Sequence, residues 1–179
     1  MTASIRPARL EDASGIAKVQ VDSWRSTYKG LIAGEFLTGL SYDGRSQYWS
    51  QNLTAPQKVR FLKVAETGPG EIVGFGFAEP EREGDMLYQG EIYAIYLFQQ
   101  AQGQGLGRKL ILTAMQKLCG RCFSSMLLWI LKDNLAARKF YEAVGGDTLR
   151  EKPVEIGSQI LVEVAYGWKN LPALVSKKE

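Results

Sequence analysis

The stretch Gln102-Gly103-Gln104-Gly105-Leu106-Gly107-Arg108 decides the fold, because it joins a predicted strand to a predicted helix. Residues 92–98 before it (IYAIYLF) are mostly β-branched or aromatic, which is typical of a buried strand. Residues 106–118 after it place apolar side chains on one face of an amphipathic helix. Glycines let a backbone approach a ligand closely, and the first N–H groups of a helix have no partners within it. The sequence therefore predicts an anion site at this helix N-terminus, suited to a ligand that carries phosphates.

Two common phosphate-binding motifs do not fit this loop. A Walker A loop needs Gly-x-x-x-x-Gly-Lys followed by Ser or Thr, and the chain has no such segment. A dinucleotide fingerprint needs Gly-x-Gly-x-x-Gly near the start of a βαβ unit. Here Gly103, Gly105 and Gly107 are each separated by one residue, and they lie past the middle of the chain. The pattern that fits is Gln/Arg-x-x-Gly-x-Gly, through Gln102, Gly105 and Gly107.

A second pattern follows the glycine loop along the chain. Residues 128–131 (LWIL) are predicted to form a strand, and Asn134 comes soon after it. Residues 135–144 then form a short predicted helix that contains Phe140-Tyr141, and Gly145-Gly146 supplies a helix stop.

The loop and this helix together resemble the GNAT superfamily of acyl-CoA-dependent N-acetyltransferases. Residues 5–13 are similar to the first strand and helix of the family. Residues 23–30 (SWRSTYKG) resemble a bacterial branch that acts on small molecules. The resemblance covers about residues 5–171, which is nearly the whole chain.

The resemblance implies an α/β fold: a mostly antiparallel, seven-stranded mixed sheet with helices on both faces. It also implies acetyl-CoA as co-substrate, its pyrophosphate held by backbone N–H groups of the glycine loop. Leu97 and Phe98 would lend backbone groups to the pantetheine arm. Asn134 would bond the same arm through its amide, although its position also suits a helix cap. The implied coenzyme A residues are Leu97, Phe98, Gln102, Gly103, Gln104, Gly105, Leu106, Gly107, Arg108 and Asn134.

The pattern of elements along the chain also predicts an α/β fold. Strands are expected near 3–6, 58–65, 72–79, 90–98, 126–131, 147–156 and 159–168, and helices near 11–27, 34–40, 42–51, 105–119 and 134–143. Strands that alternate with helices and are flanked by hairpins give a mixed sheet covered on both faces. We expect one domain over residues 1–171 and a C-terminal tail at 172–179, disordered over its last four residues.

Composition excludes several classes of function. The 179 residues are 45% hydrophobic and 23% charged, as in an ordinary globular domain. No apolar run approaches the ~20 residues of a membrane span, and no signal peptide opens the chain, so we expect a cytoplasmic protein without a membrane partner. The net charge of +3 is mild, and nucleic acid is not an expected partner.

The chain has no histidine, which excludes Ser-His-Asp and Cys-His machinery. Its two cysteines, Cys119 and Cys122, cannot fill the four positions of a structural zinc site, so no metal is expected. Cys-x-x-Cys is redox-active in some proteins. Here the pair ends a helix instead of opening one, and we interpret it as two reduced, incidental thiols.

Acetyl transfer to an amine needs a base, because an alkylamine with a pKa of about 10.4 is mostly ammonium at neutral pH. The resemblance implies a glutamate acting through ordered water at the head of the strand before the loop, which indicates Glu91. Counting back from the loop without gaps would place it at Gln89, and a bulge in the strand could absorb the offset. Glu79 on the neighbouring strand is the second candidate, and a solvent-facing carboxylate is the structural alternative for Glu91.

The resemblance further implies that the phenol of Tyr141 protonates the leaving thiolate of coenzyme A. The structural alternative is a packed core tyrosine beside Phe140. Four aromatic residues, Trp24, Tyr28, Tyr93 and Tyr96, are candidates for an acceptor pocket, and we assign substrate binding to the first three. Trp24 and Tyr28 lie four positions apart and could equally pack a helix onto the sheet.

The sequence thus predicts an acetyl-CoA-dependent N-acetyltransferase acting on a primary amine of a small molecule. Three alternatives stay open: a protein N-terminus as acceptor, a charged tRNA as acceptor, or a non-catalytic acyl-CoA-binding regulatory module. A homodimer is common in the family, and by that analogy the final strands are candidate edges for pairing in a homodimer.

Overall fold

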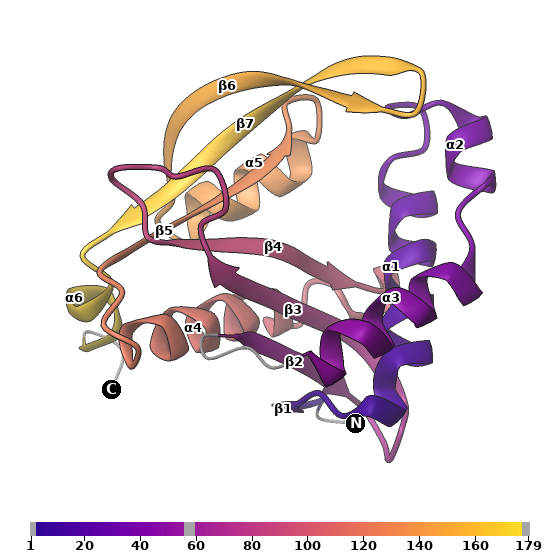
Figure 1. The fold of residues 1–179 in the computed structure, drawn as a ribbon, viewed down its shortest axis with the longest axis horizontal. Coiled ribbons are helices and arrows are strands. Elements are labelled where there is room, and N and C mark those ends of the chain that lie inside the picture. Colours follow the sequence, from indigo (N-terminus) through magenta and orange to yellow (C-terminus); the bar gives the residue numbers. More distant parts are fainter. Residues whose placement is uncertain (1–2, 56–59, 177–179) are drawn as a thin grey trace.

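The computed structural model describes residues 3–55 and 60–176, which form one seven-stranded sheet with helices on both faces (Figure 1). The strand order is β1-β2-β3-β4-β5-β7-β6, and every neighbouring pair is antiparallel except β4 and β5. The strands are β1 (Ser4–Pro7), β2 (Phe61–Glu66), β3 (Ile72–Pro80), β4 (Gly90–Leu97), β5 (Ser125–Leu131), β6 (Asp147–Ile156) and β7 (Gln159–Lys169). The helices are α1 (Ala13–Thr27), α2 (Gly34–Thr38), α3 (Tyr42–Thr54), α4 (Leu106–Cys119), α5 (Leu135–Ala143) and α6 (Leu171–Ser176), with 3-10 turns at Leu10–Asp12 and Gln99–Ala101. The predicted α/β fold is confirmed.

Two apolar layers hold the helices on the sheet. One layer packs Ile16 and Val19 of α1 and Trp49 of α3 against Phe75 and Phe77 of β3. The other layer buries the apolar stripe of α4 against the opposite face, together with side chains of α5 and α6. Each fully buried aliphatic or aromatic side chain contributes about 1.5–3 kcal/mol, so these layers fix the sheet between the helices.

β4 and β5 pair over a short stretch only. Residues 90–92 of β4 lie in parallel register with residues 126–128 of β5. Beyond them β4 continues beside β3 to Leu97, while β5 continues beside β7 to Leu131. The sheet therefore opens between its two halves, and each of these strands has one side without a strand partner there.

A β-bulge lies where this opening begins. Ala94 pairs with Phe77 and Ile92 pairs with Ala78, which makes Tyr93 the extra residue of β4. The bulge changes the alternation of side chains, because Ile92 packs in the α4 layer whereas Tyr93 and Ala94 both pack in the α1–α3 layer.

The C-terminal segment differs from the sequence prediction. Residues 171–176, expected for the most part as a tail, form α6, with Leu171 buried and Leu174 and Val175 packed in the α4 layer. The disorder expected at 177–179 and the strand start expected at 58 lie outside the described residues. Within the two described ranges, no helix has both the length and the apolar character that a bilayer crossing requires.

Candidate functional site

A cleft of about 480 Å³ occupies the opening between β4 and β5. Side chains from both layers of the sheet line it, because Ile92, Ile95 and Leu97 belong to one layer and Tyr93 and Tyr96 to the other. The cleft therefore passes from one face of the sheet to the other. Ten residues assigned to the site from the sequence line it: Tyr28, Tyr93, Leu97, Gln102, Gly103, Gly105, Gly107, Arg108, Asn134 and Tyr141.

The glycine loop has the backbone that an anion site needs. Gly103 has φ +73° and Gly105 has φ +78°, a left-handed conformation that other residues rarely adopt. Gly105 is the N-cap of α4, and nothing lies within 4 Å of a Cβ built on either glycine. Open space thus faces the first turn of α4, where unpaired N–H groups favour a negative charge.

Gly107 serves a different purpose in the same motif. A Cβ built on it would lie 3.0 Å from Cζ of Phe140, so its lack of a side chain lets α4 and α5 approach each other. Gln104 and Leu106 do not line the cleft: Gln104 donates its amide to the Gln100 carbonyl, and Leu106 is buried.

The backbone of β4 presents polar groups to the cleft. The N–H of Phe98 donates to the Val73 carbonyl of β3 at 2.9 Å. Backbone groups alternate between the two sides of a strand, so the N–H groups of Leu97 and Ile95 face the side on which β5 has separated. The N–H of Phe98, which was predicted to lend its backbone to a ligand, therefore already has a strand partner. The N–H groups that face the opening are those of Leu97 and of Ile95, which the sequence analysis did not single out.

Asn134 is buried at the start of α5 and lines the cleft. Its Oδ1 accepts a hydrogen bond from the Ala137 N–H at 3.1 Å, so it caps the helix. This cap uses the carbonyl oxygen of the amide, whereas the NH₂ group, which has two N–H donors, lies close enough to the Tyr28 hydroxyl to lower the pKa of that phenol.

Tyr141 lies on α5 with 7% of its surface exposed. Its ring packs 5.1 Å from the ring of Phe140 and 6.3 Å from that of Trp168, measured between centroids. Burial raises the pKa of its phenol, and the nearby Tyr96 raises it further, so the hydroxyl stays protonated at neutral pH. Tyr141 therefore packs in the apolar core and lines the cleft at the same time.

Glu91 is 1% exposed and lies just before the opening, where β4 still pairs with β5. It does not line the cleft itself, but its neighbours Ile92 and Tyr93 do. Burial raises the pKa of its carboxyl to about 7, against the lowering effect of Arg82, whose Nη2 lies 2.9 Å from Oε1. A carboxylate with such a pKa is suited to accept a proton near neutral pH.

The other carboxylate candidate has a structural partner. Glu79 lies opposite Glu91 on β3, and its Oε1 accepts a hydrogen bond from Arg60 Nε at 2.7 Å. Gln89, the alternative position for the base, accepts hydrogen bonds from the N–H and hydroxyl of Ser124. Glu91 is therefore the candidate whose second carboxylate oxygen has no partner among the described residues.

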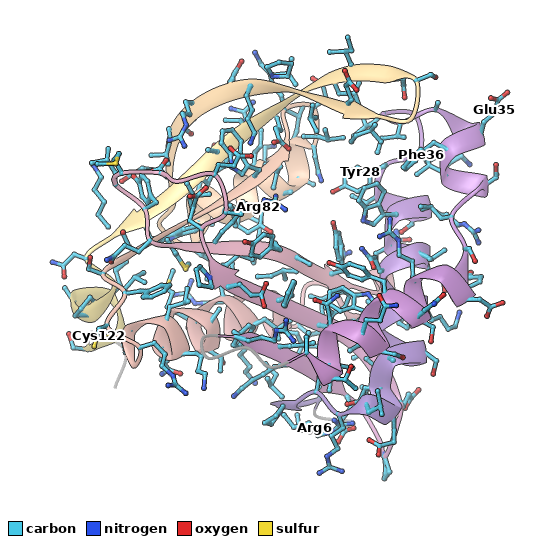
Figure 2. All side chains as sticks on the ribbon, viewed as in Figure 1. Arg6, Tyr28, Glu35, Phe36, Arg82 and Cys122 are labelled. Carbon is cyan, nitrogen blue, oxygen red and sulfur yellow. The ribbon has the colours of Figure 1, made fainter. Side chains whose placement is uncertain are left out.

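The aromatic residues form one wall of the cleft. Tyr28, the residue just after α1, points toward the centre of the molecule (Figure 2), and burial raises its pKa well above the ordinary value. Tyr93 lines the cleft as well, with its hydroxyl bonded to the Pro80 carbonyl at 2.8 Å. Trp24 lies behind the wall: its ring packs 5.0 Å from that of Tyr28 and 6.5 Å from that of Tyr96, and it does not line the cleft.

Sequence reasoning missed three polar or aromatic residues near the site. Ser23 donates to the Leu97 carbonyl at 3.1 Å, and Trp129 of β5 lines the cleft. Arg82 comes from the irregular loop between β3 and β4 and lies over β4 (Figure 2). No periodic pattern marks a loop arginine, whereas Ser23 and Trp129 lie in segments that were already singled out.

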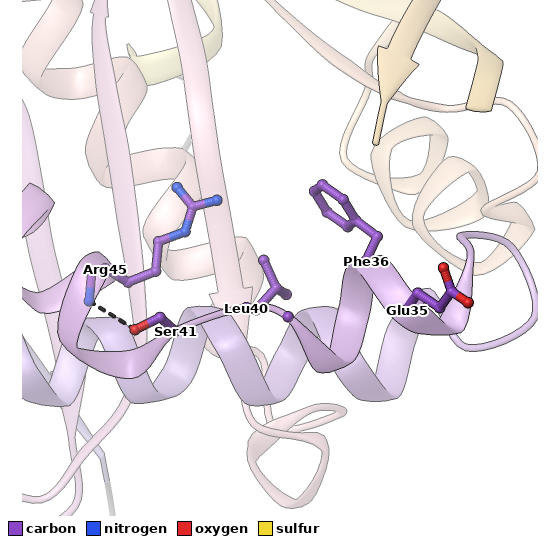
Figure 3. A pocket seen from close by; sticks show the side chains of 7 residues that line it. Glu35, Phe36, Leu40, Ser41 and Arg45 are labelled. Atoms are coloured by element: carbon purple, nitrogen blue, oxygen red, sulfur yellow. Dashed lines mark hydrogen bonds between the residues drawn. The ribbon is translucent and has the colours of Figure 1, made fainter. Parts of the chain in front are cut away.

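A second depression, of about 420 Å³, lies between α2 and the start of α3 (Figure 3). Its polar side chains are Glu35, Ser41 and Arg45, and Ser41 Oγ caps α3 by accepting from the Gly44 N–H at 3.1 Å. None of the predicted site residues line it. Cys119, the last residue of α4, and Cys122, just beyond it (Figure 2), are both free thiols, and neither lines the cleft.

Comparison with known proteins agrees with this geometry. Residues 21–145 match the model of the acetyltransferase (GNAT) family. The chain is 37% identical to an uncharacterized N-acetyltransferase, YuaI, of Bacillus subtilis. The match extends over 171 residues, which are 96% of this chain and 95% of that protein. It is 39% identical over 88 residues to a mycothiol acetyltransferase of Rhodococcus erythropolis, over 49% of this chain and 29% of that protein.

The fold is also similar to solved structures. The PaiA N-acetyltransferase of Thermoplasma acidophilum, determined in complex with coenzyme A, superposes with a TM-score of 0.72 at 19% identity, over 91% of this chain and 98% of that one. A likeness at this level of identity concerns the fold, whereas the family model and the Bacillus relative span most of the sequence. The chain belongs to the GNAT family of acetyltransferases.

Proposed function

We propose that this acetyltransferase transfers the acetyl group of acetyl-CoA to the primary amine of a small molecule. The observation that carries the proposal is the cleft that crosses the sheet where β4 and β5 separate, with the glycine loop at one end and tyrosines at the other. Its volume of about 480 Å³ is in the range of small-molecule sites.

The cofactor end of the cleft fits a pyrophosphate and a peptide-like arm. The left-handed Gly103 and Gly105 leave open space at the N-terminus of α4, where an anion is favoured, and Arg108 lines the same end. The free N–H groups of Leu97 and Ile95 and the amide of Asn134 suit the amides of a pantetheine arm. Acetyl-CoA would supply the activated acetyl group there.

Glu91 would accept the proton that the amine loses as its nitrogen bonds to the acetyl carbon. The carboxylate lies beside the cleft and not in it, so the proton would travel through water. A pKa of about 7 places it near the pH at which a base combines ionisation with basicity.

Tyr141 would supply a proton to sulfur when the carbon–sulfur bond breaks and the electron pair stays on sulfur. Its phenol lines the cleft and stays protonated, because burial raises its pKa. The backbone N–H groups of β4 would stabilise the oxygen of the attacked carbonyl, which gains negative charge during the reaction.

The acceptor end favours an amine with an apolar body. Tyr28, Tyr93 and Tyr96 line it, and burial raises the pKa of Tyr93 to about 12, so the phenols are neutral. Aromatic rings bind apolar groups by burial and bind ammonium groups over their faces.

The test is release of free coenzyme A thiol from acetyl-CoA across a panel of primary amines, with and without the protein. We expect amine-dependent release for one chemical class. If no amine causes thiol release but acetyl-CoA still raises the melting temperature, a protein or tRNA acceptor or a non-catalytic binder is favoured. If no amine causes thiol release and acetyl-CoA does not raise the melting temperature, the proposal as a whole is contradicted.

A further inference from the structure

One cation contacts the Glu91 carboxylate in the part of the chain that the structure describes. Arg82 Nη2 lies 2.9 Å from Oε1 of Glu91, and the backbone of Arg82 bonds the carboxylate as well. Oε2 is buried and has no hydrogen-bond partner among the same residues. The two oxygens of Glu91 are therefore unequal: one is anchored and the other is free.

Arg82 also lies against a side chain of the cleft. Its guanidinium carbon is 4.5 Å from the centroid of the Tyr93 ring, a distance typical of a cation–π contact. The Tyr93 hydroxyl donates to the Pro80 carbonyl, which holds the ring in place. With 55% of its side chain exposed, Arg82 connects the buried carboxylate, the cleft-lining ring and solvent.

The other charged groups around Glu91 are mostly acidic. Glu81 and Glu83, from the loop that carries Arg82, disfavour a negative charge on Glu91. Glu79 of β3, paired with Arg60, lies opposite Glu91, and Tyr93 of β4 lies close to it. Glu163 of β7, paired with Lys152 of β6, lies near Arg82. β5 contributes the apolar Leu127 opposite Glu91. Burial and these acids would hold a proton on Glu91 if Arg82 were absent.

We propose that Arg82 is a positioning residue for acetyl transfer, which anchors Oε1 of Glu91, leaves Oε2 to receive the amine proton and favours the ionised carboxylate. This inference rests on the proposed role of Glu91 as the base. Arg82 itself touches neither the amine nor the thioester in this arrangement. It acts through the carboxylate and through the face of Tyr93.

The test compares the pH profile of kcat/KM for the wild type and Arg82→Gln with one acceptor amine. The titration of the amine contributes equally to both profiles, so a difference in the acid limb reports on the enzyme. We expect the acid limb of Arg82→Gln to move to higher pH by about one unit, because a cation beside a carboxyl lowers its pKa by about that amount or more. Activity would then fall about tenfold at pH 6 and recover above pH 9.

Arg82→Lys and Arg150→Gln are the matched variants. Lysine keeps the charge but not the planar contact with Tyr93, so Arg82→Lys should restore most of the position of the acid limb. Arg150 is another arginine that pairs with an acid of the same loop, Asp85, and it is not among the groups that act on Glu91, so its loss should leave the acid limb in place. An equal loss of activity at every pH in Arg82→Gln would overturn the inference and indicate a structural role.

Glu91→Gln separates this inference from the proposed function. If Glu91 is the base, Glu91→Gln removes the part of the acid limb that the amine does not contribute, and adding Arg82→Gln to it changes the profile no further. A Glu91→Gln enzyme with the wild-type profile would refute the assignment of the base. If Glu91→Gln changes the profile as expected but the acid limb of Arg82→Gln stays at its wild-type pH, the role of Arg82 is refuted and that of Glu91 is not.

Discussion

Gly107 lies directly against Phe140, so that a Cβ built on the glycine would be 3.0 Å from Cζ of the ring. The contact joins the first turn of α4, which follows the glycine loop, to α5, which carries Tyr141. The two halves of the candidate site, the anion loop and the proposed proton donor, are therefore held to each other by one close approach across the cleft.

Replacement of Gly107 by alanine should lower both stability and turnover. Gly→Ala in a helix usually stabilises by up to about 1 kcal/mol, but here the new methyl group must displace Phe140, and overpacking costs about 1–3 kcal/mol. We expect a net loss of stability in denaturant unfolding and a lower kcat, because Tyr141 adjoins Phe140. Gly44→Ala in α3 is the control: its Cβ would meet Ser41 at 3.5 Å, an ordinary contact, so it should stabilise and leave kcat unchanged.

Replacement of Gly105 by alanine should weaken acetyl-CoA binding by about tenfold or more. The new residue would be strained at φ +78°, and its methyl group would enter the space where the pyrophosphate is expected. Gly70, in the turn between β2 and β3, also has φ +78° and open space around a Cβ, which makes Gly70→Ala a matched control for strain. Both variants should lose similar stability, and the rise in melting temperature with coenzyme A should shrink in Gly105→Ala only. Equal affinity in the two variants would exclude a role of the loop in binding.

Tyr141→Phe should lower kcat by about 10- to 1000-fold with a modest change in KM, as the loss of a general acid usually does. The phenyl ring keeps its packing on Phe140 and Trp168, so the melting temperature should change little. The raised pKa of Tyr141 also predicts no loss of activity from its ionisation below about pH 10. Wild-type turnover in Tyr141→Phe would leave the residue a purely structural role.

Glu91 should make the protein less stable as pH rises. Its pKa is raised from 4.5 to about 7, so the folded state holds this proton more tightly than the unfolded chain. The folded state therefore loses stability as pH increases between these two values, by about 3 kcal/mol in all. Glu91→Gln should remove that decline and unfold at higher denaturant concentration than the wild type at pH 8. Glu79→Gln, on the opposite strand and paired with Arg60, should retain the decline. A parallel decline in Glu91→Gln and the wild type would contradict the shifted pKa.

Most of the fold could be predicted from the sequence because its strands and helices have strong local patterns. The run at 92–98 is β-branched and aromatic, and α4 repeats apolar residues at helical spacing, so both were predicted to within a few residues. α6 was missed because a six-residue helix beginning Leu171-Pro172 has too few turns to show a period.

The candidate site could be predicted only where a short motif carries it. The glycine spacing and Asn134 lie in such motifs, and the structure brings them to one cleft with Tyr141. Arg82 could not be predicted, because its approach to Glu91 depends on how an irregular loop folds back over β4. The packing of Trp24 behind the wall was equally inaccessible, since the same spacing fits a pocket residue and a core residue.

The bulge at Tyr93 decides which face of the sheet carries Glu91. Ile92 and Ala94 pair with the adjacent residues Ala78 and Phe77, so the side chains on either side of Tyr93 keep the faces they would have if Tyr93 were absent. If β4 instead ran regularly through Tyr93 while 94–97 kept their places, every side chain before Ala94 would turn to the other face, and Glu91 would enter the apolar layer beneath α4, away from Arg82. In an alignment of related chains, a gap of one position at this point therefore marks a strand without the bulge, in which the glutamate stays on the same side of the sheet.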